Sequence, residues 1–426
     1  MPDPAAARPG RPHLRRDTQQ WIYDYVIQQS GLTYHWWSEE RSLPAEVRSQ
    51  AMVSKHLGLR ALEREEKAAS RAAEGDLAAA LKLYFQATRD FMKAQHAVLE
   101  LNAEKRFLYS GLERCYEKVR ELSPHRIERV EIEWEGQQFG GWLHLAPGSG
   151  PAPLLFNAPG CDTTCEGSPN PAHVPEHRRG WHVFSFDGPG LGRSNMRGIA
   201  LTDDNFEQAA SVALDALRRR PDVDPDRIFV YGAGAGTFWA TRLALRDGRV
   251  RALATKSGYS SLYYLMNEDA PSYKRLYGFL TQAVTEDELD RLLAKMTVDG
   301  QLSQLRCPML MVSGEYDLRD PVEEVFRLFD QVPGPAELWL FADQFHRPKF
   351  TGDRSVHEAI LDWLEATLAD TPPPPTGNSP GNRVRYIEPA AEGLTGPHVT
   401  FKRRWFEHGQ SADLGALMTE SRSLRT

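Results

Sequence analysis

The residues with the clearest chemical pattern form a short glycine-rich run, Tyr231-Gly-Ala-Gly-Ala-Gly236. The residues before it, 227–231, predict a strand, and residues 237–245 predict a helix after it. A sharp strand-to-helix turn of this kind is typical of the motif G-x-S-x-G, which presents a serine nucleophile at the apex of the turn. Here the apex residue is Gly234, so the pattern predicts the turn and lacks the nucleophile.

A dinucleotide-binding loop is the alternative interpretation of the same run, since that loop has the pattern G-x-G-x-x-G. Gly232 and Gly234 supply two glycines, but the third position is Thr237. The next predicted strand, 252–257, ends near Lys256, where an acidic residue would be needed to bind a ribose. We therefore expect no nucleotide, and the sequence shows no pattern that calls for a flavin or metal cofactor.

Two later loops carry residues suited to acid–base catalysis. Asp317 follows a strand predicted at 309–314, with Asp320 as the fallback acid, and His346 follows the strand predicted at 338–341. A carboxylate that orients a histidine allows the imidazole to act as a general base. The chain order of turn, acid and histidine is also the order in enzymes that carry the G-x-S-x-G turn.

A third loop, Asn157-Ala-Pro-Gly-Cys-Asp162, follows the strand predicted at 154–157. We expect the backbone N–H groups of Cys161 and Ala235 to form an oxyanion hole, which stabilises charge that develops on a carbonyl oxygen. Cys161 as a replacement nucleophile is a less favoured alternative. Cys161 and Cys165 lack the second pair of ligands that a zinc site needs.

A scaffold for these loops is predicted between residues 126 and 369. A hairpin at 130–145 is followed by short apolar runs that alternate with helical stretches. Besides the runs 154–157, 309–314 and 338–341 named above, the apolar runs are 183–187, 228–232 and 252–257. The helices centre near 205–219, 236–246, 322–331 and 355–369. The alternation predicts an α/β fold with a mostly parallel, eight-stranded sheet covered on both faces. The carboxyl ends of the strands then bring the loops together.

The flanking segments have other patterns. Residues 17–125 predict helices, with Asp76 as a helix N-cap, whereas residues 1–16 predict a disordered tail. Residues 370–426 predict a Pro-rich linker and a C-terminal arm. We favour a surface arm, and an arm that packs on a partner subunit is the alternative.

A helical insertion is predicted at about 258–306, over the carboxyl ends of the strands. It contains several tyrosines, of which Tyr259, Tyr263 and Tyr264 are expected to line the pocket. They would suit an aromatic or polyketide-like ligand, and ordinary packing is the alternative explanation.

The composition is that of a folded, acidic protein. The 426 residues are 41% hydrophobic and 26% charged, and the formal net charge is −7. We expect no nucleic-acid partner, because such domains usually carry a basic face, and no membrane span, because no run of about 18 apolar residues occurs. With four cysteines and no recognisable signal peptide, the expected compartment is the cytoplasm.

Taken together, residues 126–369 resemble an α/β-hydrolase. The helical segment and the loop Gly160-Cys-Asp-Thr-Thr-Cys-Glu166 are similar to those of the dihydroxypseudooxynicotine hydrolases and the fungal polyketide-shortening hydrolases. So is the run Asp187-Gly-Pro-Gly-Leu-Gly-Arg-Ser194. The resemblance implies a helical segment that caps the active site and often builds a dimer. It also implies a small-molecule substrate that is cleaved at an ester or at a carbon–carbon bond beside a carbonyl.

Carried over to this chain, the resemblance assigns the acid to Asp317, the base to His346 and the oxyanion donors to Cys161 and Ala235. It also places an acidic residue, Glu166, in the oxyanion loop, and we expect Asp162 and Glu166 to face the pocket. Gly234 departs from the family pattern, because no acyl-enzyme can form without a hydroxyl at that position.

Three accounts of Gly234 stay open. The chain is an enzyme in which His346 and Asp317 act as a general base without a serine, in lyase, cyclase, isomerase or water-activating chemistry. Or it is an inactive Ser-to-Gly variant of an ester or C–C bond hydrolase. Or it is a pseudoenzyme that binds a ligand and performs no chemistry. We favour the first account.

Overall fold

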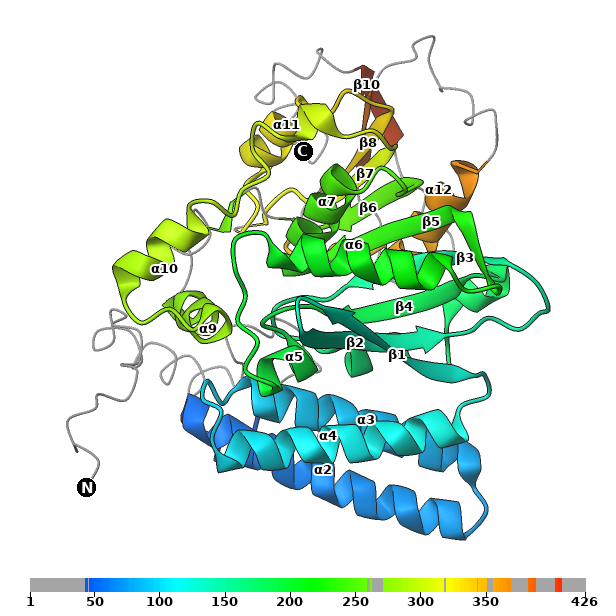
Figure 1. Cartoon of the computed structure of the whole chain (residues 1–426), viewed down its shortest axis with the longest axis vertical. Coiled ribbons are helices and arrows are strands. Elements are labelled where there is room, and N and C mark those ends of the chain that lie inside the picture. Colours follow the sequence, from blue (N-terminus) through cyan, green and yellow to red (C-terminus); the bar gives the residue numbers. More distant parts are fainter. Residues whose placement is uncertain are drawn as a thin grey trace, which may run out of the picture.

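The computed structural model describes residues 43–44, 46–258, 261–262, 271–317, 319–342, 344–350, 355–368, 382–387 and 403–407. A ten-stranded sheet runs through the molecule in the order β1-β2-β4-β3-β5-β6-β7-β8-β9-β10 (Figure 1). The strands are β1 Ile127–Trp134, β2 Gln137–His144, β3 Ala152–Ala158, β4 His182–Asp187, β5 Val223–Ala233, β6 Ala252–Lys256, β7 Met309–Gly314, β8 Ala336–Phe341, β9 Arg383–Ile387 and β10 Arg403–Glu407.

The sheet is parallel from β4 to β9, and its two ends are antiparallel. At one end β1, β2 and β4 form antiparallel pairs, and at the other end β10 pairs antiparallel with β9. The pairs between these ends are parallel, so the carboxyl ends of β3 to β8 lie along one edge of the sheet. The predicted α/β fold with a mostly parallel sheet is confirmed.

The predicted number of eight strands is wrong, because the C-terminal arm supplies β9 and β10. In the sequence Arg-Val-Arg-Tyr-Ile, apolar and charged residues alternate, and Val384 and Tyr386 are buried. Asn382 anchors the strand: its side-chain oxygen accepts the N–H of Ala336 at 2.9 Å, and its amide donates to the carbonyl of Val332 at 2.6 Å. This part of the arm therefore belongs to the sheet.

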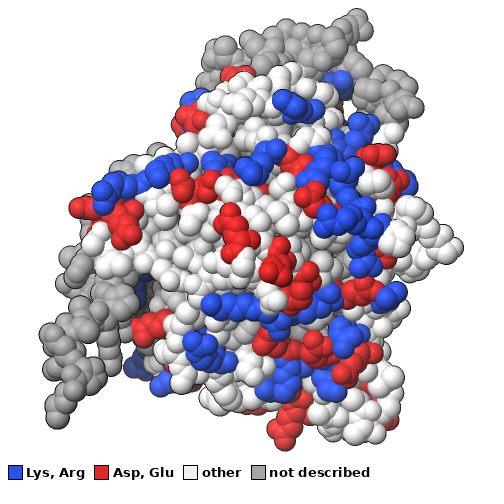
Figure 2. All heavy atoms as spheres, in the orientation of Figure 1, with Lys and Arg blue, Asp and Glu red and all other residues white. Residues whose placement is uncertain are grey.

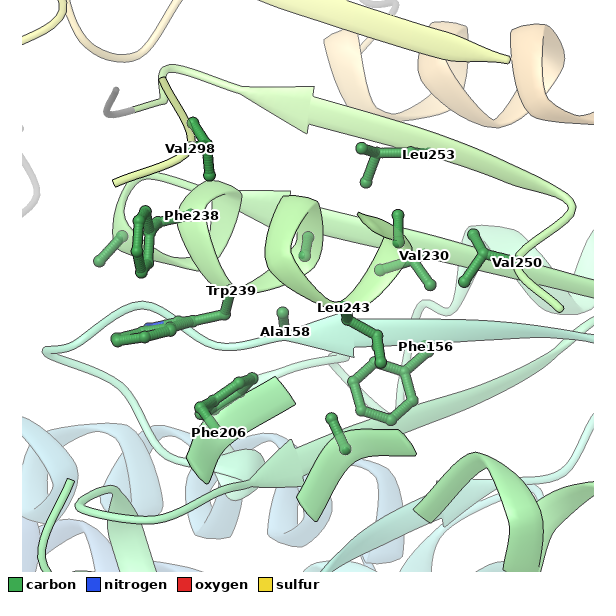
Figure 3. Close-up of a cluster of buried hydrophobic side chains, with 14 of the residues drawn as sticks. Phe156, Ala158, Phe206, Val230, Phe238, Trp239, Leu243, Val250, Leu253 and Val298 are labelled. Atoms are coloured by element: carbon green, nitrogen blue, oxygen red, sulfur yellow. The ribbon is translucent and has the colours of Figure 1, made fainter. Parts of the chain in front are cut away.

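Helices cover both faces of the sheet. One face packs against α6 Asn205–Arg218, α7 Ala235–Arg246 and α11 Val322–Phe329, and the other packs against α12 Val356–Ala366. Figure 3 shows α7 on the first face: Trp239 and Leu243 reach toward Phe206, Phe156 and the strands beneath. This packing fixes the start of α7, where the glycine-rich turn lies.

Three long helices lie beside the β1–β2 end of the sheet (Figure 1). They are α2 Gln50–Ala73, α3 Leu77–His96 and α4 Ala103–Leu122. Asp76 caps α3 by accepting the N–H of Ala79 at 3.1 Å, as the sequence predicts. A partly buried ion pair, Arg60 to Asp90 at 2.7 Å, joins α2 to α3.

The insertion contains α9 Pro271–Thr281 and α10 Glu286–Leu293. Leu276, Tyr277 and Leu289 are buried against the core on the α7 side of the sheet. Among the helices that the structure describes, none combines the length and apolarity required to cross a bilayer.

The face shown in Figure 2 carries basic and acidic side chains interspersed, without a region of one sign alone. Many of them pair. Arg193, for example, lies 2.6 Å from Glu113 of α4 and 3.0 Å from Glu131 of β1. These pairs connect the helical segment to the sheet across the surface.

Candidate active site

The glycine-rich turn between β5 and α7 has the geometry of a nucleophile elbow. Gly234 has φ 58° and ψ −126°, a conformation that residues with side chains rarely adopt. A Cβ on Gly232 would lie 2.1 Å from the carbonyl oxygen of Gly236, and one on Gly236 would lie 2.3 Å from that of Ala158. Glycine is therefore required on both sides of position 234 for the turn to close.

His346 and Asp317 come together beside this turn. The imidazole Nδ1 lies 2.8 Å from the Asp317 carboxylate, whose other oxygen accepts the N–H of Arg319 at 3.0 Å. Burial lowers the pKa of His346, and Arg319 and Arg347 lower it further, while Asp317 raises it. The net effect is a pKa below the ordinary value, so the imidazole is neutral and able to accept a proton at pH 7.

Asp320, the fallback acid, has a different environment. It is buried and accepts the N–H of Gly258 at 3.2 Å, and burial together with the charge of Asp317 raises its pKa well above the ordinary value. The acid that contacts the histidine is therefore Asp317, at 2.8 Å.

The space above Gly234 faces the imidazole. A Cβ built on Gly234 would lie 3.4 Å from His346 Nε2, and within 4 Å its only other neighbour among the described residues is Cε1 of the same ring. A hydroxyl on that carbon would be within hydrogen-bond reach of Nε2. The turn thus holds an opening for a small polar group directly in front of the base.

The two expected oxyanion donors border the same cavity. Ala235 is the first residue of α7, so its N–H has no acceptor within the helix. Cys161 lies in a loop that is bent where the carbonyl of Gly160 accepts the N–H of Thr163 at 3.2 Å. Burial raises the pKa of the Cys161 thiol, as does the charge of Asp162, so the structure offers no support for a nucleophilic thiolate.

A cavity of about 500 Å³ opens at the carboxyl ends of the strands. Gly234, Ala235, Cys161, Asp162 and His346 all contribute to its walls. No described residue of α2, α3 or α4 lines this cavity. A smaller pocket beside it, which shares Cys161 and Asp162, is lined by Gln95 and His96 of α3 and Lys105 of α4, and the cap role that the resemblance implied for these helices stays a prediction. The predicted pocket tyrosines, Tyr259, Tyr263 and Tyr264, lie outside the described residues.

Glu166 does not line the cavity, contrary to the sequence-based expectation. It is buried, and its carboxylate accepts the indole N–H of Trp142 at 3.1 Å. A buried group beside the loop of Cys161 consists of Cys165, Glu166 and Asp187. Asp187 accepts the N–H groups of Cys165 and Arg193, so it holds Cys165, which follows this loop, in place. Burial and the charge of Glu166 raise the pKa of Asp187 to about 7.

Several cavity residues were missed from the sequence. They are Lys256 at the end of β6, Arg319, Arg347, and the pair Glu176 and His357, whose side chains lie 2.6 Å apart. Lys256 was visible in the sequence as the residue that ends a predicted strand. Glu176 and His357 are 181 residues apart and match no local motif, so only the fold brings them together.

The sheet, the elbow between β5 and α7, and the acid and histidine on later loops define an α/β-hydrolase. The family model described as Esterase FrsA-like matches residues 44–269, more than half of the chain. This protein therefore belongs to the FrsA-like esterase family. A second model, the prolyl oligopeptidase family, matches residues 188–371.

Individual relatives agree with this assignment. The chain is 28% identical over 293 residues to Hydrolase LUC6 of a Fusarium species, covering 57% of this chain and 70% of that protein. It is 27% identical over 256 residues to the 2,6-dihydropseudooxynicotine hydrolase of Paenarthrobacter nicotinovorans, covering 59% of this chain and 68% of that one. The crystal structure of a 2,6-dihydroxy-pseudo-oxynicotine hydrolase superposes with a TM-score of 0.68 at 23% identity, covering 83% of this chain and 98% of its own. That likeness shows the fold.

Proposed function

We propose that this protein acts on a carbonyl-containing small molecule by general-base catalysis, without a covalent serine intermediate. In this proposal His346 is the base, Asp317 orients it, and the N–H groups of Cys161 and Ala235 form the oxyanion hole. The proposed substrate is an ester or a compound cleaved beside a carbonyl, and the proposal is supported by relatives that are named hydrolases. The opening at Gly234 holds the water.

The observation that carries this proposal is the opening between Gly234 and His346 Nε2. A water there would donate a proton to Nε2, while its oxygen attacks the carbonyl carbon and the carbonyl electron pair moves to the oxygen held by the two N–H groups. Collapse of this intermediate expels the leaving group, which takes the proton back from the imidazolium. Proton abstraction from the substrate itself, in lyase, cyclase or isomerase chemistry, needs the same base and the same donors.

A second candidate is a serine hydrolase whose nucleophile is absent from this chain. The same geometry favours it, because a serine at position 234 would meet His346 Nε2 without displacing another described residue. A ligand-binding pseudoenzyme is the third candidate. The retained contact of 2.8 Å between His346 and Asp317 speaks against it, because binding alone does not require this pair.

Hydrolysis of 4-nitrophenyl acetate by the chain with glycine at position 234 tests the proposal. We expect turnover faster than the about 10³- to 10⁴-fold over water that an oxyanion hole and a binding site alone give in a serine hydrolase without its triad, because the general base adds about 10²-fold or more. His346→Gln should remove most of this turnover, by about 10²-fold or more, because the general base is lost. Turnover that is unchanged in His346→Gln, or absent from the starting chain, would contradict general-base hydrolysis of esters.

A further inference from the structure

We propose that the cavity recognises a substrate that carries a carboxylate, and that Lys256, with Arg347 at the mouth, binds this group. This inference rests on the proposed function, because it takes the cavity beside Gly234 and His346 as the substrate site. It adds a substrate class and two specificity-determining residues to that site.

The position of Lys256 links it to the elbow. Lys256 ends β6 in register with Ala233 of β5, and its carbonyl accepts the N–H of Gly234 at 2.9 Å. Paired residues of parallel strands project to the same face of a sheet, so the Lys256 side chain extends on the face that carries Ala233 and Tyr231. All three residues line the cavity.

The charges around the cavity leave Lys256 without an acidic partner. Among the described residues, its walls carry the cations Lys256, Arg319 and Arg347 and the carboxylates Asp162 and Glu176. Glu176 binds His357 at 2.6 Å, and Asp162 has interactions of its own. Within the described part of the chain, no salt bridge or side-chain hydrogen bond joins a carboxylate to Lys256.

A cation in this position favours an anionic ligand. Burial, together with the neighbouring charges of Arg347 and Lys349, lowers the pKa of Lys256 to about 8. Desolvation and like charges are unfavourable for the ammonium group, and a bound carboxylate would relieve both. A carboxylate also accepts charge-assisted hydrogen bonds from lysine and arginine, which a neutral amide of the same shape accepts more weakly.

Equilibrium binding of a matched pair of probes tests this inference. The probes are 4-oxo-4-phenylbutanoate and its primary amide, which share a ketone and an aromatic ring and differ in charge. Isothermal titration of the unmodified chain should give about tenfold or tighter binding of the carboxylate. Lys256→Met should reduce this preference to about twofold or less, and Lys256→Arg should retain most of it.

Lys349→Met is the matched control, because Lys349 is an exposed neighbour that does not line the cavity. It should keep the preference for the carboxylate. Arg347→Met should lower the preference without abolishing it. Equal binding of acid and amide by the unmodified chain, or a preference that survives in folded Lys256→Met, would overturn the inference.

The binding readout requires no turnover, so it separates this inference from the proposed function. Carboxylate selectivity that depends on Lys256 supports the inference even if His346→Gln leaves esterase activity unchanged. Loss of selectivity together with His346-dependent activity overturns the inference and leaves the proposed function in place. Thermal unfolding of each variant shows whether it is folded.

Discussion

At the scale of single residues, the proposed chemistry depends on Gly234. A glycine accepts φ 58° without strain and leaves room in front of His346 Nε2. The contact between Asp317 and His346 could be predicted from the sequence, because each residue follows a buried strand and their order along the chain matches the α/β-hydrolase pattern. The presence of Lys256, Glu176 and His357 in the cavity could not be predicted from the sequence. It depends on which face of the sheet their side chains occupy and on how the fold brings distant segments together.

The pH dependence of any His346-dependent activity should reflect the lowered pKa of this residue. The neutral imidazole is the active form, so the rate should rise with pH and level off once the proton is lost. Because burial shifts the pKa below 6.5, the midpoint of kcat/KM against pH should lie below 6.5. A midpoint above 6.5 would show that the active base is another group or that Asp317 outweighs burial.

Removal of the acid should weaken the base without abolishing binding. Asp317→Asn replaces the carboxylate that holds His346 Nδ1, so the ring loses its preferred tautomer. We expect kcat to fall by about 10²-fold or more with KM little changed. Asp320→Asn serves as the control, since the carboxylate that contacts His346 is that of Asp317, whereas Asp320 accepts the N–H of Gly258. An equal loss in both variants would contradict this assignment.

At the scale of elements, the strands and helices of the core follow from the sequence, and the C-terminal strands do not. The predicted helix 205–219 matches α6, and the predicted strand 309–314 matches β7. In these two elements, the apolar positions that the sequence spacing assigns to the core are buried in the structure. Strand β9 is short and follows a proline-rich run, so its alternation Arg383-Val-Arg-Tyr-Ile387 carries too few apolar positions to be distinguished from a surface segment.

Asn382 should be a major anchor of β9. Its side chain makes two buried hydrogen bonds, to Ala336 and Val332, before the strand begins. Asn382→Ala leaves both backbone groups without that partner, so the free energy of unfolding should fall by about 2–3 kcal/mol. Chemical denaturation measures this loss. A change in the free energy of unfolding below about 0.5 kcal/mol would show that the backbone pairing with β8 holds the strand without Asn382.

At the scale of the whole molecule, a polar chain joins the helical segment to the sheet. Tyr116 of α4 contacts His144 Nε2 at 2.9 Å, and His144 Nδ1 lies 2.9 Å from His125 Nε2. The ring of His177 packs edge-on against His125 with centroids 4.4 Å apart. The sequence predicts the helices and the hairpin as separate elements. It does not predict the contact between them, because Tyr116, His125 and His144 belong to no local sequence pattern.

Acid should weaken this junction. Burial lowers the pKa of His125 to about 4 and lowers those of His144 and His177, while the unfolded chain has histidines near 6.5. Below pH 6.5 the unfolded state therefore binds more protons, so the free energy of unfolding should fall as the pH drops from 6.5 toward 4. Urea denaturation at several pH values measures this slope.

His125→Gln should make the slope shallower, because one group that takes up a proton on unfolding is removed. The control is His173→Gln, since His173 is exposed and lies outside this chain of contacts. An equally steep slope in His125→Gln and in the starting chain would contradict the assignment to this cluster.

The most direct test of the central claim is fluorophosphonate labelling of Gly234→Ser, followed by intact mass. The account predicts one adduct on Gly234→Ser, because His346, held by Asp317, lies beside position 234, and the proposed oxyanion donors would stabilise the attacked phosphoryl oxygen. It predicts no adduct on the chain with glycine or on Gly234→Ser combined with His346→Gln. A folded Gly234→Ser protein that stays unlabelled, or labelling that persists without His346, would contradict the claim that a working base and oxyanion hole face position 234.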